Sequence, residues 1–140
     1  MEALYTAEAL STGAGRTGRV ITADGTLDLT MAPPQEMGGS GDGANPEQLF
    51  AAGYAACFHS ALQGVARQRK VSVQDSSVGG RVQIGSNGEG GFQLAVELEV
   101  VLPGIPAEQA QELADAAHQV CPYSNATRGN ISVTVSVSDD

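Results

Sequence analysis

The sequence predicts an α+β fold, in which antiparallel strands pack on two helices within one domain over residues 1–140. Three observations support this prediction. Residues 49–62 are almost all apolar or small, which is typical of a helix enclosed by other elements. Residues 92–102 alternate between apolar and polar side chains, the pattern of a strand with one wet face. Further alternating runs, separated by glycine-rich turns, favour strands with both helices against the buried face of their sheet.

The first part of the chain is predicted to form a small meander of strands. Extended runs at 4–11 and 18–22 flank a glycine-rich connection, GAGRTG, at 13–18. An Asp-Gly hairpin signal follows and leads into an alternating run at 27–30.

A loop rich in proline and glycine precedes the central helix, which is predicted from Asn45 to about Arg69. Asn45 can cap this helix, Pro46 fits its first position, and Gln48 completes a capping-box spacing. The run of small residues that follows allows another backbone to approach closely, so a second helix is expected to cross it. We expect the rest of the fold to be organised around this helix.

The remaining elements follow the same patterns. Alternating apolar residues predict a strand around 78–84, a long strand over 92–102 and a closing strand over 131–137. Pro106 opens a second helix, and Pro122 is expected to end it. Both predicted helices thus lie between strands, as an α+β fold requires.

The charge of the chain restricts its partners. The chain contains only seven Lys and Arg but sixteen Asp and Glu, so its net charge is −9. The pI is near 4.4. Nucleic acids and anionic membranes require a basic patch, so neither is an expected partner. The N-terminal residues MEALYTAEAL lack both a basic segment and a long apolar run, and a cytoplasmic location is therefore expected.

The two cysteines, Cys57 and Cys121, are the candidate reactive groups. In a reducing compartment a structural disulfide is the less favoured explanation, and catalytic, metal-binding and inert roles remain open. Cys57 lies among small apolar residues, where burial raises a thiol pKa, and about three helical turns from the helix N-terminus. A reactive Cys57 therefore needs a cation from elsewhere in the fold.

Zinc is the competing chemistry, because Cys57-x-His59 and His118-x-x-Cys121 offer two thiols and two imidazoles. Residues two apart on a helix point about 200° from one another, so Cys57 and His59 cannot face one ion. The sequence also contains no P-loop, dinucleotide fingerprint or Ser-His-Asp arrangement. Neither a metal nor a bound cofactor is expected.

Two long motifs, NPEQLFAAGYAACF at 45–58 and AHQVCPYSNATRGNI at 117–131, resemble those of the organic hydroperoxide resistance proteins of the OsmC-like superfamily. ALYTAEALSTGAGRTGR near the start, GGF in the hairpin and the valine-rich end follow in the order of that family. The similarity covers essentially the full chain. It implies an OsmC-like fold and an intertwined homodimer.

The resemblance also implies a function. Members of the family are thiol peroxidases that reduce organic and fatty-acid hydroperoxides to alcohols, with dihydrolipoamide or a lipoylated protein as the electron donor. By this resemblance Cys57 is the peroxidatic cysteine and Cys121 the resolving cysteine, and the two form a disulfide. Arg16 and Glu47 are the polar pair that organises the thiolate, with Arg19 as the alternative arginine.

The spacing of Glu47 and Cys57 bears on how the site is assembled. They lie ten residues apart on one predicted helix, about 15 Å along its axis, too far to share a small site. Either the helix bends or a second subunit contributes. We expect a two-fold dimer in which Arg16 and Glu47 of one chain meet Cys57 of the other.

Three functional classes remain open on the residues alone: a thiol peroxidase, a binding module for a hydrophobic ligand, and a structural protein with inert cysteines. Within the superfamily, an OsmC-branch peroxidase with a different substrate preference is a further alternative. Leu49, Phe50, Tyr54 and Phe58 surround the first cysteine in the sequence and favour an alkyl or acyl chain over hydrogen peroxide.

Overall fold

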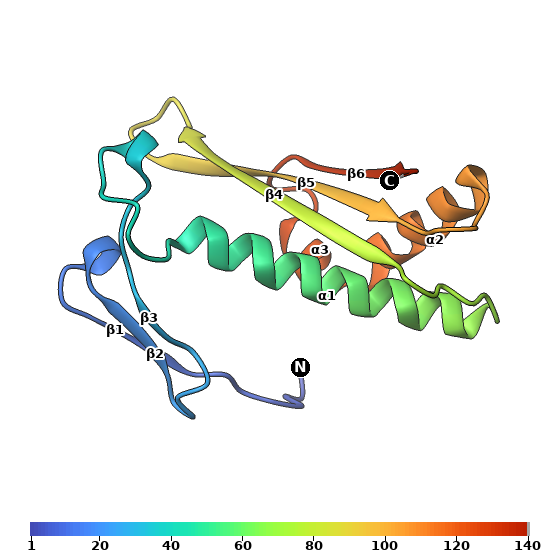
Figure 1. Ribbon diagram of the computed structural model, residues 1–140, viewed down its shortest axis with the longest axis horizontal. Coiled ribbons are helices and arrows are strands. Elements are labelled where there is room, and N and C mark those ends of the chain that lie inside the picture. The colour runs from blue at the N-terminus through green and yellow to red at the C-terminus, as the bar shows by residue number, and fades with distance from the viewer. Residues whose placement is uncertain (140) are drawn as a thin grey trace. The chain divides into compact units, whose positions relative to one another are not determined.

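The computed structural model describes residues 1–139 and confirms the α+β prediction, with two three-stranded sheets and three α-helices (Figure 1). The contacts divide the chain into two compact units, Met1–Leu49 and Phe50–Asp140. The single domain over residues 1–140 stays a prediction.

The Met1–Leu49 unit is built on an antiparallel sheet in the order β1-β2-β3. Its strands are β1 (Ala9–Thr12), β2 (Arg19–Thr22) and β3 (Asp28–Thr30). β1 is shorter than the predicted run from residue 4, because β2 offers only four residues to pair with. Short 3₁₀ helices at Gly15–Thr17 and Gln35–Met37 lie in the connections.

Helix α1 spans Pro46–Gln68, within the predicted limits. The predicted capping box is confirmed: the Gln48 N–H donates to Asn45 Oδ1 at 2.8 Å, and the Asn45 N–H donates to Gln48 Oε1 at 3.1 Å. The start of the helix is therefore fixed by its own sequence.

One face of α1 is buried, and it carries the large side chains Tyr54, Phe58 and Leu62. The opposite face carries small residues, of which Ala52, Ala56 and Ser60 are exposed. The apolar sequence predicts that α1 is enclosed on all sides. Within one chain, α1 is therefore not fully enclosed.

The Phe50–Asp140 unit contains the second sheet, in the order β4-β5-β6. β4 (Ser77–Ser86) and β5 (Phe92–Val101) form an antiparallel pair, as predicted. β6 (Val133–Ser138) instead pairs with β5 in parallel, with Val133 opposite Val96. This differs from the antiparallel arrangement expected. The helical segment between β5 and β6 returns the chain to the end where β5 begins, so both strands run the same way.

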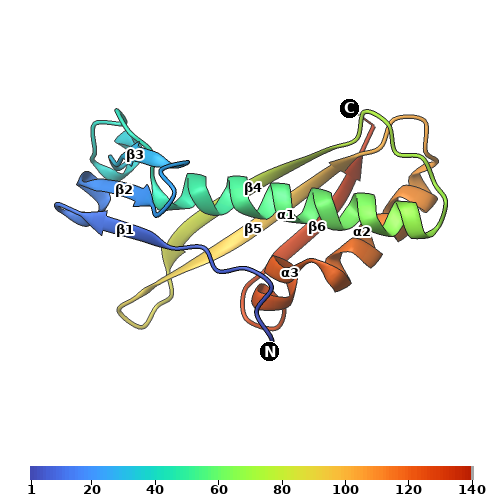
Figure 2. The same cartoon turned by 90° about the horizontal axis from the view of Figure 1, so that it is seen from below.

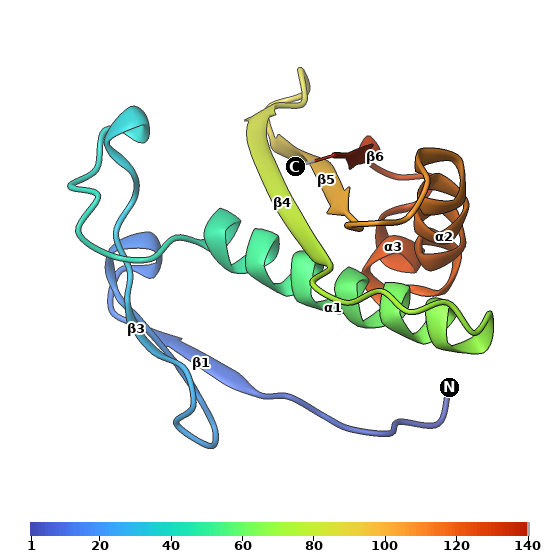
Figure 3. The ribbon, with the colours of Figure 1, turned by 45° about the vertical axis from the view of Figure 1, so that its right-hand side comes forward.

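That segment consists of α2 (Ala107–Val120) and α3 (Pro122–Thr127). α2 matches the predicted second helix, whereas α3 was not predicted. Figures 1 and 2 show α1 running along one face of the β4-β5-β6 sheet, and Figure 3 shows α2 and α3 together on that same side.

The core lies between this sheet and the helices. Val96, Leu98 and Val100 of β5 are buried, while Glu97 and Glu99 point to the wet face, as the alternation predicts. Within residues 1–139, no helix is both long and apolar enough to cross a bilayer.

Candidate active site

Arg16 lies in the 3₁₀ turn Gly15–Thr17, which connects β1 to β2. Gly15 has φ +65°, in the left-handed region that favours glycine. A Cβ on Gly18 would lie 2.0 Å from the Thr12 carbonyl oxygen, so only glycine fits where the turn closes on the end of β1. The glycines of this connection therefore fix the turn that presents Arg16.

Arg16 forms a bidentate ion pair with Glu47 in the first turn of α1. Its Nη1 donates to Glu47 Oε2 at 2.9 Å, and its Nη2 donates to Oε1 at 2.7 Å. These hydrogen bonds lower the pKa of Glu47 and raise that of Arg16. The Glu47 side chain is largely buried and that of Arg16 is 40% exposed, so the guanidinium keeps access to a further anion.

Arg19, the alternative arginine, belongs to a separate pair. Its Nε and Nη2 donate to the two carboxylate oxygens of Asp28 across β2 and β3, at 2.7 and 2.6 Å. Both side chains are about half exposed.

Cys57 lies in the middle of α1 and is partly exposed. Burial raises the pKa of its thiol, and a hydrogen bond from the Tyr123 backbone N–H acts in the opposite direction. Burial therefore disfavours the thiolate form of Cys57. The prediction that it needs a cation is consistent with this environment.

Cys121 lies between α2 and α3 and is fully buried. α2 ends at Val120, and the chain turns at Cys121 with extended backbone angles before Pro122 opens α3. The turn places the thiol of Cys121 3.8 Å from Cys57 Sγ, and both cysteines are free. The two sulfur atoms are therefore nearly in van der Waals contact.

The structure thus brings the four predicted residues together as two pairs, one in each unit. Arg16 meets Glu47 in the first unit, and Cys57 meets Cys121 in the second.

A buried polar network beside the cysteines was not predicted. The Tyr54 hydroxyl lies 2.9 Å from Ser124 Oγ and 3.0 Å from Thr127 Oγ1, and Ser124 Oγ lies 2.7 Å from His118 Nδ1. Burial lowers the pKa of His118, with a further contribution from the charge of Arg128. One feature of the sequence could have indicated this network. Tyr54 lies in an apolar helix, and its hydroxyl requires a hydrogen-bond partner when it is buried.

A groove of about 470 Å³ opens at Cys57, and we call it the Cys57 groove. None of its lining side chains is charged: Cys57, Ser60, Ala61, Gly64, Val65, Gln68, Val120 and Pro122. Two of the aromatic residues expected around the substrate do not line it, because Tyr54 and Phe58 are fully buried in the core. Phe50 and Tyr123 instead line a separate apolar pocket of about 510 Å³.

The histidines are engaged in hydrogen bonds with serines: His59 Nε2 lies 2.8 Å from Ser76 Oγ, and His118 contacts Ser124. Among residues 1–139, no three or more His, Cys, Asp and Glu side chains are grouped so as to hold a metal ion.

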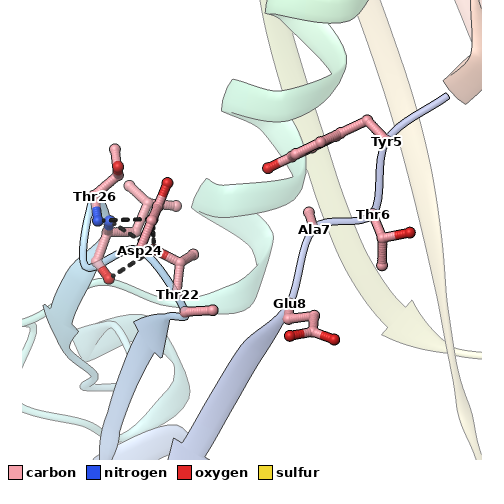
Figure 4. A pocket seen from close by; sticks show the side chains of 9 residues that line it. Tyr5, Thr6, Ala7, Glu8, Thr22, Asp24 and Thr26 are labelled. Carbon is pink, nitrogen blue, oxygen red and sulfur yellow. Dashed lines mark hydrogen bonds between the residues drawn. The ribbon is translucent and has the colours of Figure 1, made fainter.

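The Met1–Leu49 unit has a pocket of its own, about 430 Å³ in volume, between the segment at 5–8 and the turn after β2 (Figure 4). Two acidic side chains, Glu8 and Asp24, line it. Asp24 accepts hydrogen bonds from the Thr22 hydroxyl and the Thr26 N–H, both at 2.9 Å. Neither the cysteines nor the Arg16–Glu47 pair lines this pocket, so we do not place the active site there.

Comparison with known proteins gives one consistent result. The sequence model of the family described as OsmC-like protein matches residues 39–136. The organic hydroperoxide resistance protein of Xanthomonas axonopodis pv. citri is 52% identical over 96% of this chain and 95% of its own length. A solved organic hydroperoxide resistance protein from Elizabethkingia anophelis superposes with a TM-score of 0.94 at 50% identity, with full coverage of both chains. One from Legionella pneumophila gives 0.93 at 50% identity, covering 98% of this chain and 99% of that one.

Proposed function

This chain belongs to the organic hydroperoxide resistance proteins of the OsmC-like family, and we propose that it is a cysteine-based peroxidase that reduces organic hydroperoxides to alcohols. A role in organic peroxide resistance follows from its relatives. The observation that carries the finer proposal is the 3.8 Å distance between Cys57 Sγ and Cys121 Sγ.

In the proposed cycle, the Cys57 thiolate attacks the O–O bond of the hydroperoxide. The sulfur takes one oxygen and becomes a sulfenic acid, while the other oxygen leaves as an alkoxide and is protonated to the alcohol. The Cys121 thiol then attacks the sulfenic sulfur, water leaves, and the disulfide forms. This second step protects Cys57 from irreversible oxidation.

The thiolate is proposed to form beside a cation. Because burial raises the pKa of Cys57, a nearby guanidinium is needed to favour the charged form. The bidentate Arg16–Glu47 pair is a suitable donor, since Glu47 holds the guanidinium rigidly while part of it remains exposed. The same cation would stabilise the charge that develops on the leaving oxygen.

The active site is proposed to be shared between two chains. The ten-residue separation of Glu47 and Cys57 along the sequence favours this arrangement, as does the exposed face of α1, whose residues are small enough for close helix packing. In the resulting two-fold dimer, Arg16 and Glu47 of one chain serve Cys57 of the other.

The proposed substrates are alkyl and fatty-acid hydroperoxides, and the proposed electron donor is a lipoyl dithiol. The uncharged lining of the Cys57 groove supports both, because each presents a neutral or aliphatic portion to the sulfur. An OsmC-branch peroxidase would differ in its preference between hydrogen peroxide and bulky hydroperoxides.

The peroxidase proposal is tested by measuring intact mass after one equivalent of cumene hydroperoxide is added to the reduced protein. A loss of two hydrogens that dihydrolipoamide reverses is expected. The Cys121→Ser variant should instead accumulate oxidised Cys57. An unchanged mass would contradict the proposal and favour a module that binds a hydrophobic ligand.

The shared site is tested with a mixed dimer of Glu47→Ala and Cys57→Ser chains. Each variant alone lacks one half of every site, whereas a mixed dimer contains one complete site. A one-to-one mixture should therefore recover about a quarter of the wild-type activity if chains exchange freely. A mixture as inactive as its components would show that each site is built from one chain.

A further inference from the structure

Gly53 lies inside α1, four residues before Cys57, at a position where the backbone does not require glycine. It is not one of the glycines with positive φ, and glycine inside a helix is less favourable than alanine. Its packing explains it. A Cβ on Gly53 would lie 2.8 Å from the Oη atom of Tyr123 and 3.3 Å from the Cε2 and Cζ atoms of that ring. The missing side chain therefore lets the Tyr123 ring lie directly on the helix.

Two aromatic residues of α1 also contact the Tyr123 ring. Its centroid lies 6.1 Å from that of Phe50 and 5.5 Å from that of Tyr54, with the rings inclined at 67° and 50°. Inclined pairs at these distances are favourable. Phe50, Gly53 and Tyr54 are three and four residues apart, so they share one face of α1, which we call the ring face, and Cys57 continues it.

The ring of Tyr123 is linked to the second cysteine by a short and stiff piece of chain. Only Pro122 separates Tyr123 from Cys121, and its ring fixes its own φ. The backbone N–H of Tyr123 donates a hydrogen bond to Cys57. The same turn thus meets α1 at the ring face and at Cys57, where the two sulfur atoms are 3.8 Å apart.

We propose that Gly53 and the Tyr123 side chain are positioning residues for the resolving step, because the ring, packed on Gly53, holds Cys121 beside Cys57. The proposal rests on the function proposed above, which supplies the Cys57 sulfenic acid. In the resolving step the Cys121 sulfur bonds to the Cys57 sulfur, and the sulfenic oxygen leaves as water. Gly53 and the ring act on this step through the position of Cys121.

The position of Cys121 matters because the sulfenic acid has two fates. Attack by Cys121 gives the disulfide, whereas a second hydroperoxide transfers an oxygen to the sulfur, giving a sulfinic acid and another alcohol. A thiol held close to its target reacts as if it were highly concentrated. Moving the Tyr123 ring away from α1 should lower this effective concentration and favour the sulfinic acid.

The first test compares wild-type protein with Gly53→Ala at equilibrium in mixtures of reduced and oxidised dithiothreitol, with free thiols trapped by N-ethylmaleimide. We expect the Cys57–Cys121 disulfide to be about tenfold less favoured in the variant, about 30 mV for a two-electron couple. An unchanged equilibrium would overturn the proposal. No hydroperoxide is used, so a shifted equilibrium in a protein that does not consume cumene hydroperoxide would support the positioning and refute the proposed function.

A double-mutant cycle identifies the ring as the cause. In a Tyr123→Ala background, Gly53→Ala displaces no ring and should shift the equilibrium less than about twofold. In Tyr123→Phe, which lacks the nearest atom Oη, the effect should be intermediate. Equal shifts in all three backgrounds would show that alanine acts on α1 itself and would refute the proposal.

The second test follows over-oxidation during turnover. With increasing cumene hydroperoxide, Gly53→Ala should accumulate the sulfinic form, a gain of two oxygens, at about a tenfold lower excess than the wild type. Urea denaturation shows whether each variant is folded. Tyr123→Ala, at a partly exposed side chain, tests the same prediction if Gly53→Ala does not fold. Wild-type ratios of disulfide to sulfinic acid in the folded variants would contradict the positioning role.

Discussion

At the scale of single residues, Tyr54 places a polar group inside the hydrophobic core. Its ring is fully buried in α1, yet its hydroxyl must find polar partners there. Ser124 and Thr127 of α3 supply them, and His118 of α2 extends the network. One hydroxyl thus ties α1 to the segment that carries Cys121.

Replacing Tyr54 with Phe removes both of these hydrogen bonds while preserving the ring. Ser124 keeps His118 and Thr127 keeps the Ser124 carbonyl, so neither is left without a partner. We expect a loss of about 1–2 kcal/mol in the free energy of unfolding, measured by urea denaturation. Tyr123→Phe is the matched control, because that tyrosine is partly exposed and lies outside this hydrogen-bond network. Equal effects in the two variants would contradict the role of the network.

His118 predicts a pH dependence of stability. Burial lowers its pKa in the folded protein, so the unfolded chain takes up a proton at a higher pH than the folded one. The contribution of neutral His118 to the stability of the fold is complete above the histidine pKa of the unfolded chain, about 6.5. This contribution is lost as the pH falls toward the pKa of His118 in the folded protein. Urea midpoints at pH 7 and pH 5 should therefore differ less in His118→Gln than in the wild type. An unchanged difference would rule out His118 as the source.

At the scale of elements, α1 has a well-defined start. There the backbone N–H groups of Asn45 and Gln48 each donate a hydrogen bond to the side-chain oxygen of the other residue. Glu47 lies between these two residues, in the first turn, where a carboxylate is favoured by the helix dipole. The cap therefore also holds Glu47 in position for Arg16.

Replacing Asn45 with Ala removes the side-chain acceptor of the capping box. We expect a loss of about 1 kcal/mol in the free energy of unfolding, and a smaller loss for Asn45→Gly. Thermal denaturation of the two variants measures both. If Asn45→Ala were as stable as the wild type, the cap would contribute nothing to the fold.

The elements also show where sequence patterns fail. Alternation located β6 but carried no information on the direction in which it pairs, and the parallel pairing with β5 depends on the return path of the chain. α3 has only six residues, Pro122–Thr127, too few to show helical periodicity. Both errors concern the segment around Cys121, where the tertiary packing determines the local structure.

At the scale of the whole molecule, the raised pKa of Cys57 and the proposed dimer are linked. Burial raises the pKa of the Cys57 thiol and so disfavours the nucleophilic thiolate. A second chain that supplies Arg16 would reverse this, because an adjacent positive charge favours the thiolate.

Replacing Arg16 with Met should therefore raise the pKa of Cys57. In a Cys121→Ser background, the rate of Cys57 alkylation as a function of pH reports the thiolate. We expect the midpoint of this profile to move upward in Arg16→Met, to or above the value of about 8.5 for a free cysteine.

Arg19→Met is the control, since Arg19 is paired with Asp28 in its own bidentate contact. Its profile should match that of the background protein. A shift in Arg19→Met without one in Arg16→Met would transfer the role to Arg19.

The sequence by itself determined the features that depend on near neighbours. The capping residues located the start of α1, alternation located β5, and the two cysteine motifs pointed to the family. The meeting of Cys57 with Cys121 across 64 residues was implied only by the family resemblance, and the structure shows their sulfur atoms 3.8 Å apart. Only the tertiary structure decided that Tyr54 meets Ser124 across 70 residues. It also decided that Cys57 is partly exposed while Cys121 is buried. The physical reason is that caps and periodicity act within a few residues, whereas burial and long-range contacts are set by how complete elements pack together.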